Sequence, residues 1–215
     1  MSMKKHLLLI CLMGVFTLHT RAQHSDSLYF TQIKIAPLKM FLNANPGIEF
    51  SIERLIRPRY SLQVSYAFLT DLFHQTYSES FKGYQAGLEG KLFQKVTRKK
   101  LNYISTEVRY LKVEQEKALL FTPAAAPEYT DTATISRKTI ALNFKLGRMY
   151  TMGHFVIDIG VGAGLKYKNI THSGRIHPAD PLDNPVDPNV YYPSENPGKG
   201  FVLNLPVIVR IGYSF

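Results

Sequence analysis

The sequence contains no tryptophan, a single cysteine and no long uninterrupted apolar segment. The cysteine, Cys11, lies in a leader segment expected to be removed, so the mature chain can form no disulfide and no cysteine-based zinc or nucleophile site. No segment approaches the ~18 apolar residues of a transmembrane helix, which excludes a helical membrane protein. Apolar residues still make up 45% of the 215 residues, which excludes a disordered chain.

The N-terminus has the pattern of a secretory signal peptide. Two lysines precede an apolar core at Leu7–Leu18, and Thr20-Arg21-Ala22 offers small residues for cleavage. We therefore expect residues 1–22 to be removed on export. The remaining 23–215 would form one domain.

Beyond residue 28, apolar residues recur at every second position, which is the period of β-strands. In the last segment, every odd position from Phe201 to Phe215 is apolar. Segment 154–170 repeats this pattern, with glycines and charged residues on its second face. The alternation predicts eight strands, at 30–41, 47–56, 60–70, 82–94, 101–114, 138–150, 154–170 and 200–215.

Alternation alone fits two barrels of opposite polarity. In a soluble barrel the apolar face forms the core, whereas in a transmembrane barrel it contacts lipid and the polar face lines the lumen. Apolar faces of about 7–8 residues rimmed by Tyr and Phe fit tilted strands that cross ~25 Å of hydrocarbon. With the export signal, they predict an all-β fold: a closed antiparallel eight-stranded transmembrane barrel in the outer membrane of a Gram-negative bacterium.

The connections alternate in length, as expected for a barrel with short periplasmic turns and long outer loops. The long connections are expected at about 71–81, 115–137 and 171–199. The chain carries 26 Lys+Arg against 16 Asp+Glu, a net charge of +10. Basic residues gather in two of the short turns, where we expect them to contact lipid headgroups and not nucleic acid.

The polar face of the strands predicts a network of charges in the lumen. An eight-stranded barrel is only wide enough to be filled by its own side chains, and an unpaired buried charge is costly. The alternative is an ion path, or an acid–base pair such as Glu49 with Glu89. The predicted network comprises Lys34, Glu49, Glu53, Glu89, Lys91, Glu107, Arg109, Lys145, Asp158, Lys166 and Arg210.

Two further kinds of site are possible in the outer loops. His74 with Ser78 and Glu79 would suit a lipid-modifying enzyme at the rim, but no complete set of nucleophile, base and orienting group is visible. We therefore expect no catalytic residue. The last loop lacks the spacing of a known calcium site, so no metal and no cofactor is predicted, although it carries oxygen ligands at Asp180, Asp183, Asn184, Asp187, Asn189 and Glu195.

Apolar segments in the expected outer loops are candidate contact surfaces: Leu119, Leu120 and Phe121 in one loop, Tyr191 and Tyr192 in another. Such residues are unusual in loops unless they reach lipid or another protein. The sequence therefore favours a non-enzymatic barrel that stabilises the membrane or docks a partner, such as another outer-membrane protein. The alternative is a rim enzyme that modifies lipid A or phospholipid.

Several segments are typical of small outer-membrane barrels: Ile33-Lys34-Ile35-Ala36-Pro37-Leu38, Gly47-Ile48-Glu49-Phe50, Tyr60-Ser61-Leu62-Gln63 and the glycine-rich 158–164. The C-terminal 209–215, with Tyr213 and Phe215, is similar to the signal read by the barrel-insertion machinery. On these segments, residues 33–215 resemble the small eight-stranded outer-membrane β-barrel family of unknown function typical of Bacteroidota. The resemblance implies the fold, the location and the insertion machinery as a partner, and it supplies no catalytic residue. Girdles in such barrels often use Trp, so here Tyr and Phe must serve.

Overall fold

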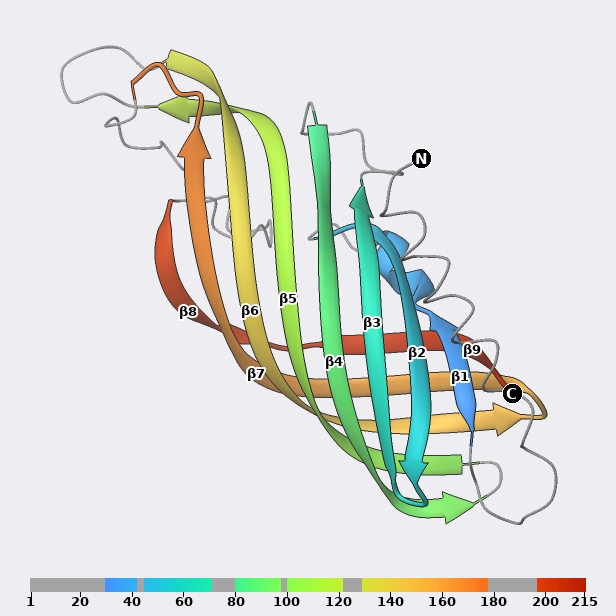
Figure 1. The fold of residues 1–215 in the computed structure, drawn as a ribbon. Helices are drawn as coiled ribbons and strands as arrows, with labels where there is room; N and C mark the ends of the chain where they lie inside the picture. The colour runs from blue at the N-terminus through green and yellow to red at the C-terminus, as the bar shows by residue number, and fades with distance from the viewer. Residues whose placement is uncertain (1–29, 42–44, 71–79, 98–99, 122–128, 178–196) are drawn as a thin grey trace, which may run out of the picture.

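In the part of the chain that the structure describes, nine β-strands are joined by antiparallel pairing (Figure 1). The computed structural model describes residues 30–41, 45–70, 80–97, 100–121, 129–177 and 197–215. The expected signal peptide lies outside these ranges. The strands are β1 (Thr31–Ile35), β2 (Gly47–Arg57), β3 (Tyr60–Thr70), β4 (Ser80–Thr97), β5 (Lys100–Phe121), β6 (Tyr129–Met152), β7 (Phe155–Ser173), β8 (Gly198–Asn204) and β9 (Val207–Ser214), with a 3-10 helix η2 (Pro37–Phe41) after β1.

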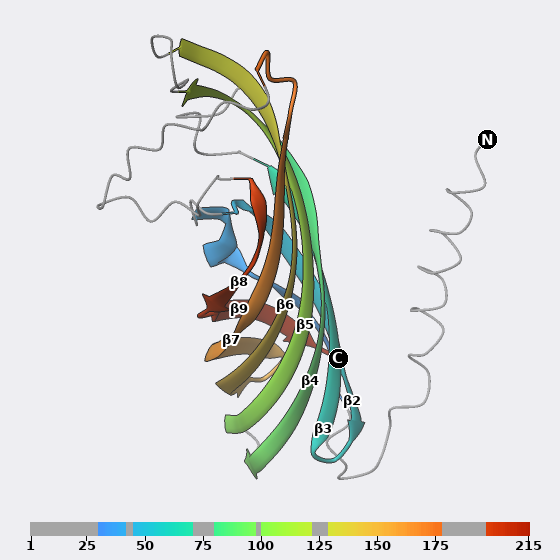
Figure 2. The same cartoon turned by 90° about the vertical axis from the view of Figure 1, so that its left-hand side faces the viewer.

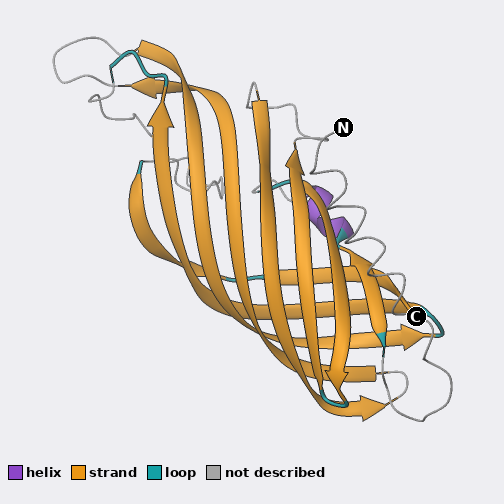
Figure 3. Ribbon diagram, viewed as in Figure 1, coloured by secondary structure: helices purple, strands orange, loops and turns teal. Residues whose placement is uncertain are grey.

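The sheet closes on itself. Its strand order runs from β6 through β1 to β9 and β7, and an additional β6–β7 pairing completes the ring (Figure 3). β8 and β9 both pair with β7 and together fill the place of one strand, so the wall of the barrel has eight strand positions. We call the end where β2 meets β3 and β6 meets β7 the turn end, and the opposite end the loop end. In the described part of the chain, no helix is long and apolar enough to cross a membrane.

The single last strand expected at 200–215 is interrupted at Leu205 and Pro206. Proline has no backbone N–H to donate to a neighbouring strand, which explains the break. The Pro206 carbonyl still accepts a hydrogen bond from the Gly162 N–H at 2.9 Å. The register against β7 is the same on both sides of the break, so β8 and β9 are two segments of one interrupted strand.

The first strand is shorter than the predicted 30–41, because the chain leaves the sheet at Pro37. The Ala36 N–H makes the last bond toward β2, to the Glu49 carbonyl at 3.1 Å. The chain then turns into η2, which packs against β2 and β9. Figure 2 shows η2 on the same side of the barrel as β8 and β9, facing the long strands β4 and β5.

β5 and β6 are longer than predicted and extend into the segment 115–137 expected to be a loop. Their pairing continues without a register shift to Phe121 opposite Tyr129. The extension is stabilised because Leu119 and Phe121 bury against Ala133 and Ile135. The prediction of exposed loop contacts at Leu119, Leu120 and Phe121 is therefore wrong. All three lie on β5, where Leu119 and Phe121 are buried and Leu120 is half-buried.

The barrel is apolar outside and polar inside. Large apolar side chains point outward along every strand, as at Val64 (56% exposed) and Leu146 (64% exposed), whereas Glu53, Asp158 and Arg210 are 0% exposed. A soluble barrel has the reverse arrangement, since its apolar residues fill the core. The closed ring and this polarity confirm the predicted fold class, a closed antiparallel eight-stranded transmembrane β-barrel.

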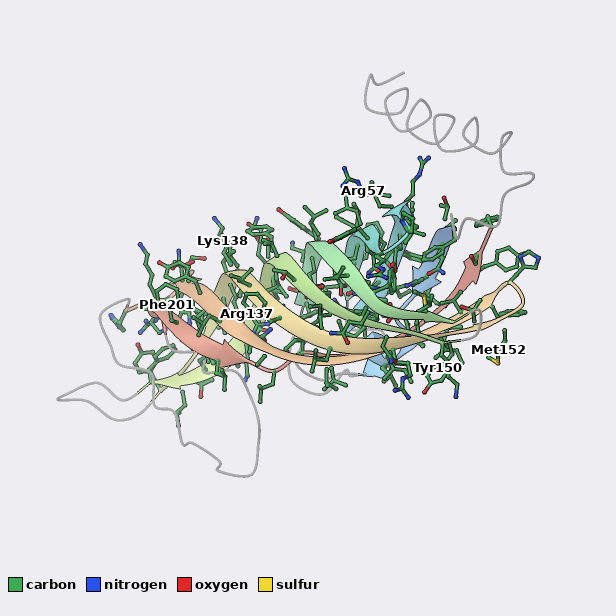
Figure 4. The ribbon with its side chains drawn as sticks, turned by 90° about the horizontal axis from the view of Figure 1, so that it is seen from below. Arg57, Arg137, Lys138, Tyr150, Met152 and Phe201 are labelled. Carbon is green, nitrogen blue, oxygen red and sulfur yellow. The ribbon has the colours of Figure 1, made fainter. Side chains whose placement is uncertain are left out.

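Outward aromatic rings gather near both ends of the apolar wall, where transmembrane barrels carry aromatic girdles. Because the chain has no Trp, these rings belong to Tyr and Phe, as expected. Toward the loop end, Tyr66 lies against Phe68 and Tyr84, with ring centroids 4.9 and 6.3 Å apart. At the turn end, Tyr213 contacts Phe155 and Phe215, at 6.3 and 5.0 Å. Figure 4 shows Arg57, Tyr150 and Met152 near this end.

Candidate functional site: the lumen of the barrel

Apolar side chains close the lumen at the turn end. They come from four strands, β2, β4, β5 and β6, together with the start of β7, and Phe30 packs against them. The Phe93 ring meets Phe30 and Tyr103 edge-on, at 6.2 and 6.0 Å. The buried members of this cluster are Leu55, Phe93, Leu101, Tyr103, Met149 and Val156.

Above this apolar layer, two lysines and two carboxylates form a compact square of ion pairs. Lys34 contacts Glu53 at 2.5 Å and Asp158 at 2.9 Å, and Lys91 contacts the same two oxygens at 2.8 and 2.6 Å. The Tyr103 hydroxyl donates to the second Asp158 oxygen at 2.6 Å. All four charged side chains are 0% exposed, so each charge depends on partners inside the barrel. Ser61 also donates to Glu53 at 2.5 Å, and Gln63 accepts from Lys91 at 3.1 Å.

A second group of charges lies closer to the loop end. Lys145 contacts Glu89 at 2.8 Å and Glu107 at 3.2 Å. Arg109 contacts the same Glu107 oxygen at 2.6 Å, and the Asn143 amide donates to the other one at 2.9 Å. Each carboxylate therefore meets at least one cation at short range.

Arg210 on β9 joins the two groups. Its guanidinium lies 3.2 Å from Glu49 and from Glu89, 3.8 Å from Glu107 and 3.9 Å from Asp158. The side chain is 0% exposed. Arg210 thus lies between Glu49 and Glu89, and both carboxylates are buried.

Sequence reasoning missed one member of the network, Lys39. In a continuous strand its odd position would face outward with Ile33 and Ile35. The turn into η2 directs it inward instead, where its amine lies 3.1 Å from Glu49. The signal that could have revealed it is Pro37, which ends the strand two residues earlier.

Glycines provide the room that the long cations occupy. A Cβ at Gly162 would collide with the Lys145 side chain, and one at Gly212 with the Lys34 side chain. Both glycines lie directly across from these lysines, on β7 and β9. The glycine-rich face of β7 is thus a requirement of luminal packing.

One predicted member lies outside the network. Lys166 faces the lumen nearer the loop end, beside Ala141 of β6 and Val202 of β8. The charged groups that act on its amine are Arg137 and Lys168, both of them cations. The alternation placed Lys166 on the correct face, but it lies beyond the reach of the carboxylates. All other predicted members of the network make the ion pairs described above.

Several candidate residues lie outside the described residues: His74, Ser78, Glu79, Tyr191, Tyr192 and the oxygen-rich positions of the last loop. Within the described ranges, no group of three or more His, Cys, Asp or Glu side chains could hold a metal ion. Tyr213 stacks on His154, with centroids 5.1 Å apart. The role of Tyr213 and Phe215 as an insertion signal stays a prediction.

No family model matches the chain, and no curated protein matches it. Several solved structures resemble it, of which we describe two. The first is Neisserial surface protein A (NspA), with a TM-score of 0.41, 11% identity, and coverage of 87% of this chain and 97% of that one. The second is a major outer membrane protein from Thermus thermophilus, with a TM-score of 0.43, 12% identity, and coverage of 87% and 98%. The first is named as a surface protein and the second as an outer-membrane protein, and likeness at this level carries no argument.

Proposed function

We propose that this chain is a non-enzymatic protein of the outer membrane. The observation that carries the proposal is the polarity of the wall. Exposed leucine, isoleucine, valine and phenylalanine side chains ring the barrel, whereas the charged side chains in the middle of the lumen are buried. In a bilayer that surface contacts hydrocarbon, and the closed pairing of β1 to β7 with β9 satisfies the backbone of most of the wall. The proposed partners are lipid and lipopolysaccharide, with the insertion machinery during assembly.

The lumen, in this proposal, is closed to ions. The cations Lys34, Lys39, Lys91, Arg109, Lys145 and Arg210 face the carboxylates Glu49, Glu53, Glu89, Glu107 and Asp158, so the charges nearly balance. An ion entering this region would have to displace a partner from a pair that is largely or fully buried. The apolar layer at the turn end adds a second barrier.

The function proposed for such a closed barrel is to stabilise the membrane or to dock a partner through its loop end. The loop-end surface is extended by the long β5–β6 hairpin. On this proposal, purification in mild detergent recovers the barrel with a second outer-membrane protein. Shortening residues 118–134 and 174–198 abolishes that association.

The deciding experiment compares membrane lipids with and without the protein. A non-enzymatic barrel leaves the acyl patterns of lipid A and phospholipid unchanged. An altered pattern that is restored by the wild-type chain but not by His74→Ala would contradict the proposal and favour a rim enzyme.

A further inference from the structure

The wall of the barrel is incomplete at one place near the loop end. β8 is hydrogen-bonded to β7 on one edge, and no described strand pairs with its other edge. β1, which would cover that edge if it ran the full height, ends at Ile35 and is replaced by η2. β9 does pair with β1, so the open edge is confined to β8.

Both faces of β8 are accessible as a result. Phe201 and Leu203 on its outer face are 75% and 63% exposed, and Val202 on its inner face is 38% exposed. A Cβ at the inward Gly200 would meet nothing within 4 Å. Inward residues deeper in the barrel, such as Lys34 and Arg210, are at most 1% exposed. The inner face of β8 therefore borders open space.

Two lysines point into this space from β7. Lys166 lies directly across from Val202, and Lys168 lies directly across from Gly200. Among the described residues, neither lysine has a carboxylate partner, and the Arg137 charge lies nearby. The hydrogen bond from Asn204 to Asn143, at 2.7 Å, separates them from the paired charges below. Positive charge is thus concentrated where no described anion balances it.

The neighbouring surface is apolar. Tyr167 and Phe201 lie against each other on the outer face of β7 and β8, with ring centroids 5.1 Å apart. Leu205 continues this surface toward the turn end and is 65% exposed. A ligand that reaches the lysines past the free edge of β8 must also cross this apolar surface.

We infer that Lys166 and Lys168 bind the phosphate of an anionic membrane lipid, whose acyl chains lie over the apolar edge of β8. Ammonium groups without an internal partner form charge-assisted hydrogen bonds with phosphate oxygens. A free phosphate would satisfy the lysines but would gain nothing from Val202 and Phe201. The inference rests on the proposed membrane location, since the bilayer supplies the lipid.

The test measures binding of dihexanoyl phosphatidic acid to the full-length mature chain in a neutral detergent, by titration calorimetry. The Lys166→Gln/Lys168→Gln variant should bind about tenfold more weakly or not at all, because two charge-assisted contacts are lost. The matched control is Lys138→Gln/Lys199→Gln, which removes two exposed cations from β6 and β8, the strands on either side of β7. Lys138 lies on the opposite side of β6 from Arg137 (Figure 4). The control should bind as the wild type does.

Inorganic phosphate and dihexanoyl phosphatidylcholine are the competing probes. The inference requires that neither displaces phosphatidic acid at equal concentration. Equal binding of inorganic phosphate, equal loss in both double variants, or no binding by the wild type would each overturn it. A barrel that fails to shift on gels after boiling in SDS would instead contradict the proposed membrane fold, so the two failures are distinguishable.

Discussion

The middle of the lumen and its loop end both carry charged side chains, but only in the middle do positive and negative charges nearly balance. Around Arg210, every buried cation lies within ion-pair distance of a carboxylate. Around Lys166, the neighbouring charges are cations and the wall beside it lacks a strand partner. The carboxylates of β2, β4, β5 and β7 contact cations in the middle of the lumen, and none of those described acts on the Lys166 amine.

This contrast assigns different roles to the two regions: the middle of the lumen stabilises the fold, and the loop end binds a ligand. Paired charges that fill the middle act as internal structure, and removing one leaves its partner buried and unpaired. Lys166 and Lys168 have no carboxylate partner among the described residues and should add little to folding, which agrees with the lipid site inferred above. Variants that affect one region and spare the other can break or sharpen this division.

The largest effect is expected for Arg210→Ala. It removes the guanidinium that bridges Glu49 and Glu89 and leaves both carboxylates short of a cation. The free energy of unfolding should fall by about 3–5 kcal/mol, as for other broken buried pairs. Urea unfolding of the chain in lipid vesicles measures this loss. A fall of less than ~1 kcal/mol would show that the network does not depend on Arg210.

A smaller effect is expected for Tyr103→Phe, which keeps the ring and removes only the hydroxyl. Asp158 then loses a hydrogen bond of 2.6 Å while keeping both lysines. Hydrogen bonds to charged groups contribute about 1.5–3 kcal/mol, so the same unfolding assay should record a loss in that range. An unchanged midpoint would mean that Asp158 is satisfied by its lysines alone.

A pair of glycine variants compares the packing of the two regions. A Cβ at Gly147 would collide with the Tyr103 ring, whereas one at Gly200 would meet no atom within 4 Å. Gly147→Val should therefore destabilise the barrel by about 1–3 kcal/mol through overpacking, and Gly200→Val should not. Equal losses would contradict the open space assigned to the inner face of β8.

The smallest effect is expected for Lys166→Ala. The side chain has no carboxylate partner among the described residues and two cations as neighbours, so its loss should change stability by no more than about 0.5 kcal/mol. Lys145→Ala on the adjacent strand is the matched control, because it removes contacts to Glu89 and Glu107 and should be clearly destabilising. Similar losses in the two variants would place Lys166 in the network after all.

Much of the fold and of the candidate site can be predicted from the period-two alternation of apolar and polar residues. It places Glu53, Lys91 and Arg210 on one face, and the limited width of an eight-stranded barrel then requires that they pair. Alternation does not show how far along the barrel axis a residue lies. For this reason the sequence groups Lys166 with carboxylates that it does not contact. Alternation also does not reveal where a strand leaves the sheet. Lys39 therefore counts as an outward position in the sequence, although the turn into η2 directs it into the lumen. The extension of β5 and β6 depends on contacts between distant segments, which local periodicity cannot supply.

The central claim is that paired charges close the middle of the lumen, and single-channel recording in planar bilayers tests it most directly. The wild-type barrel should insert without steady conductance, because Lys34, Lys91, Glu53 and Asp158 are fully buried against one another. Steady, reproducible channels from the unmutated protein would contradict the account.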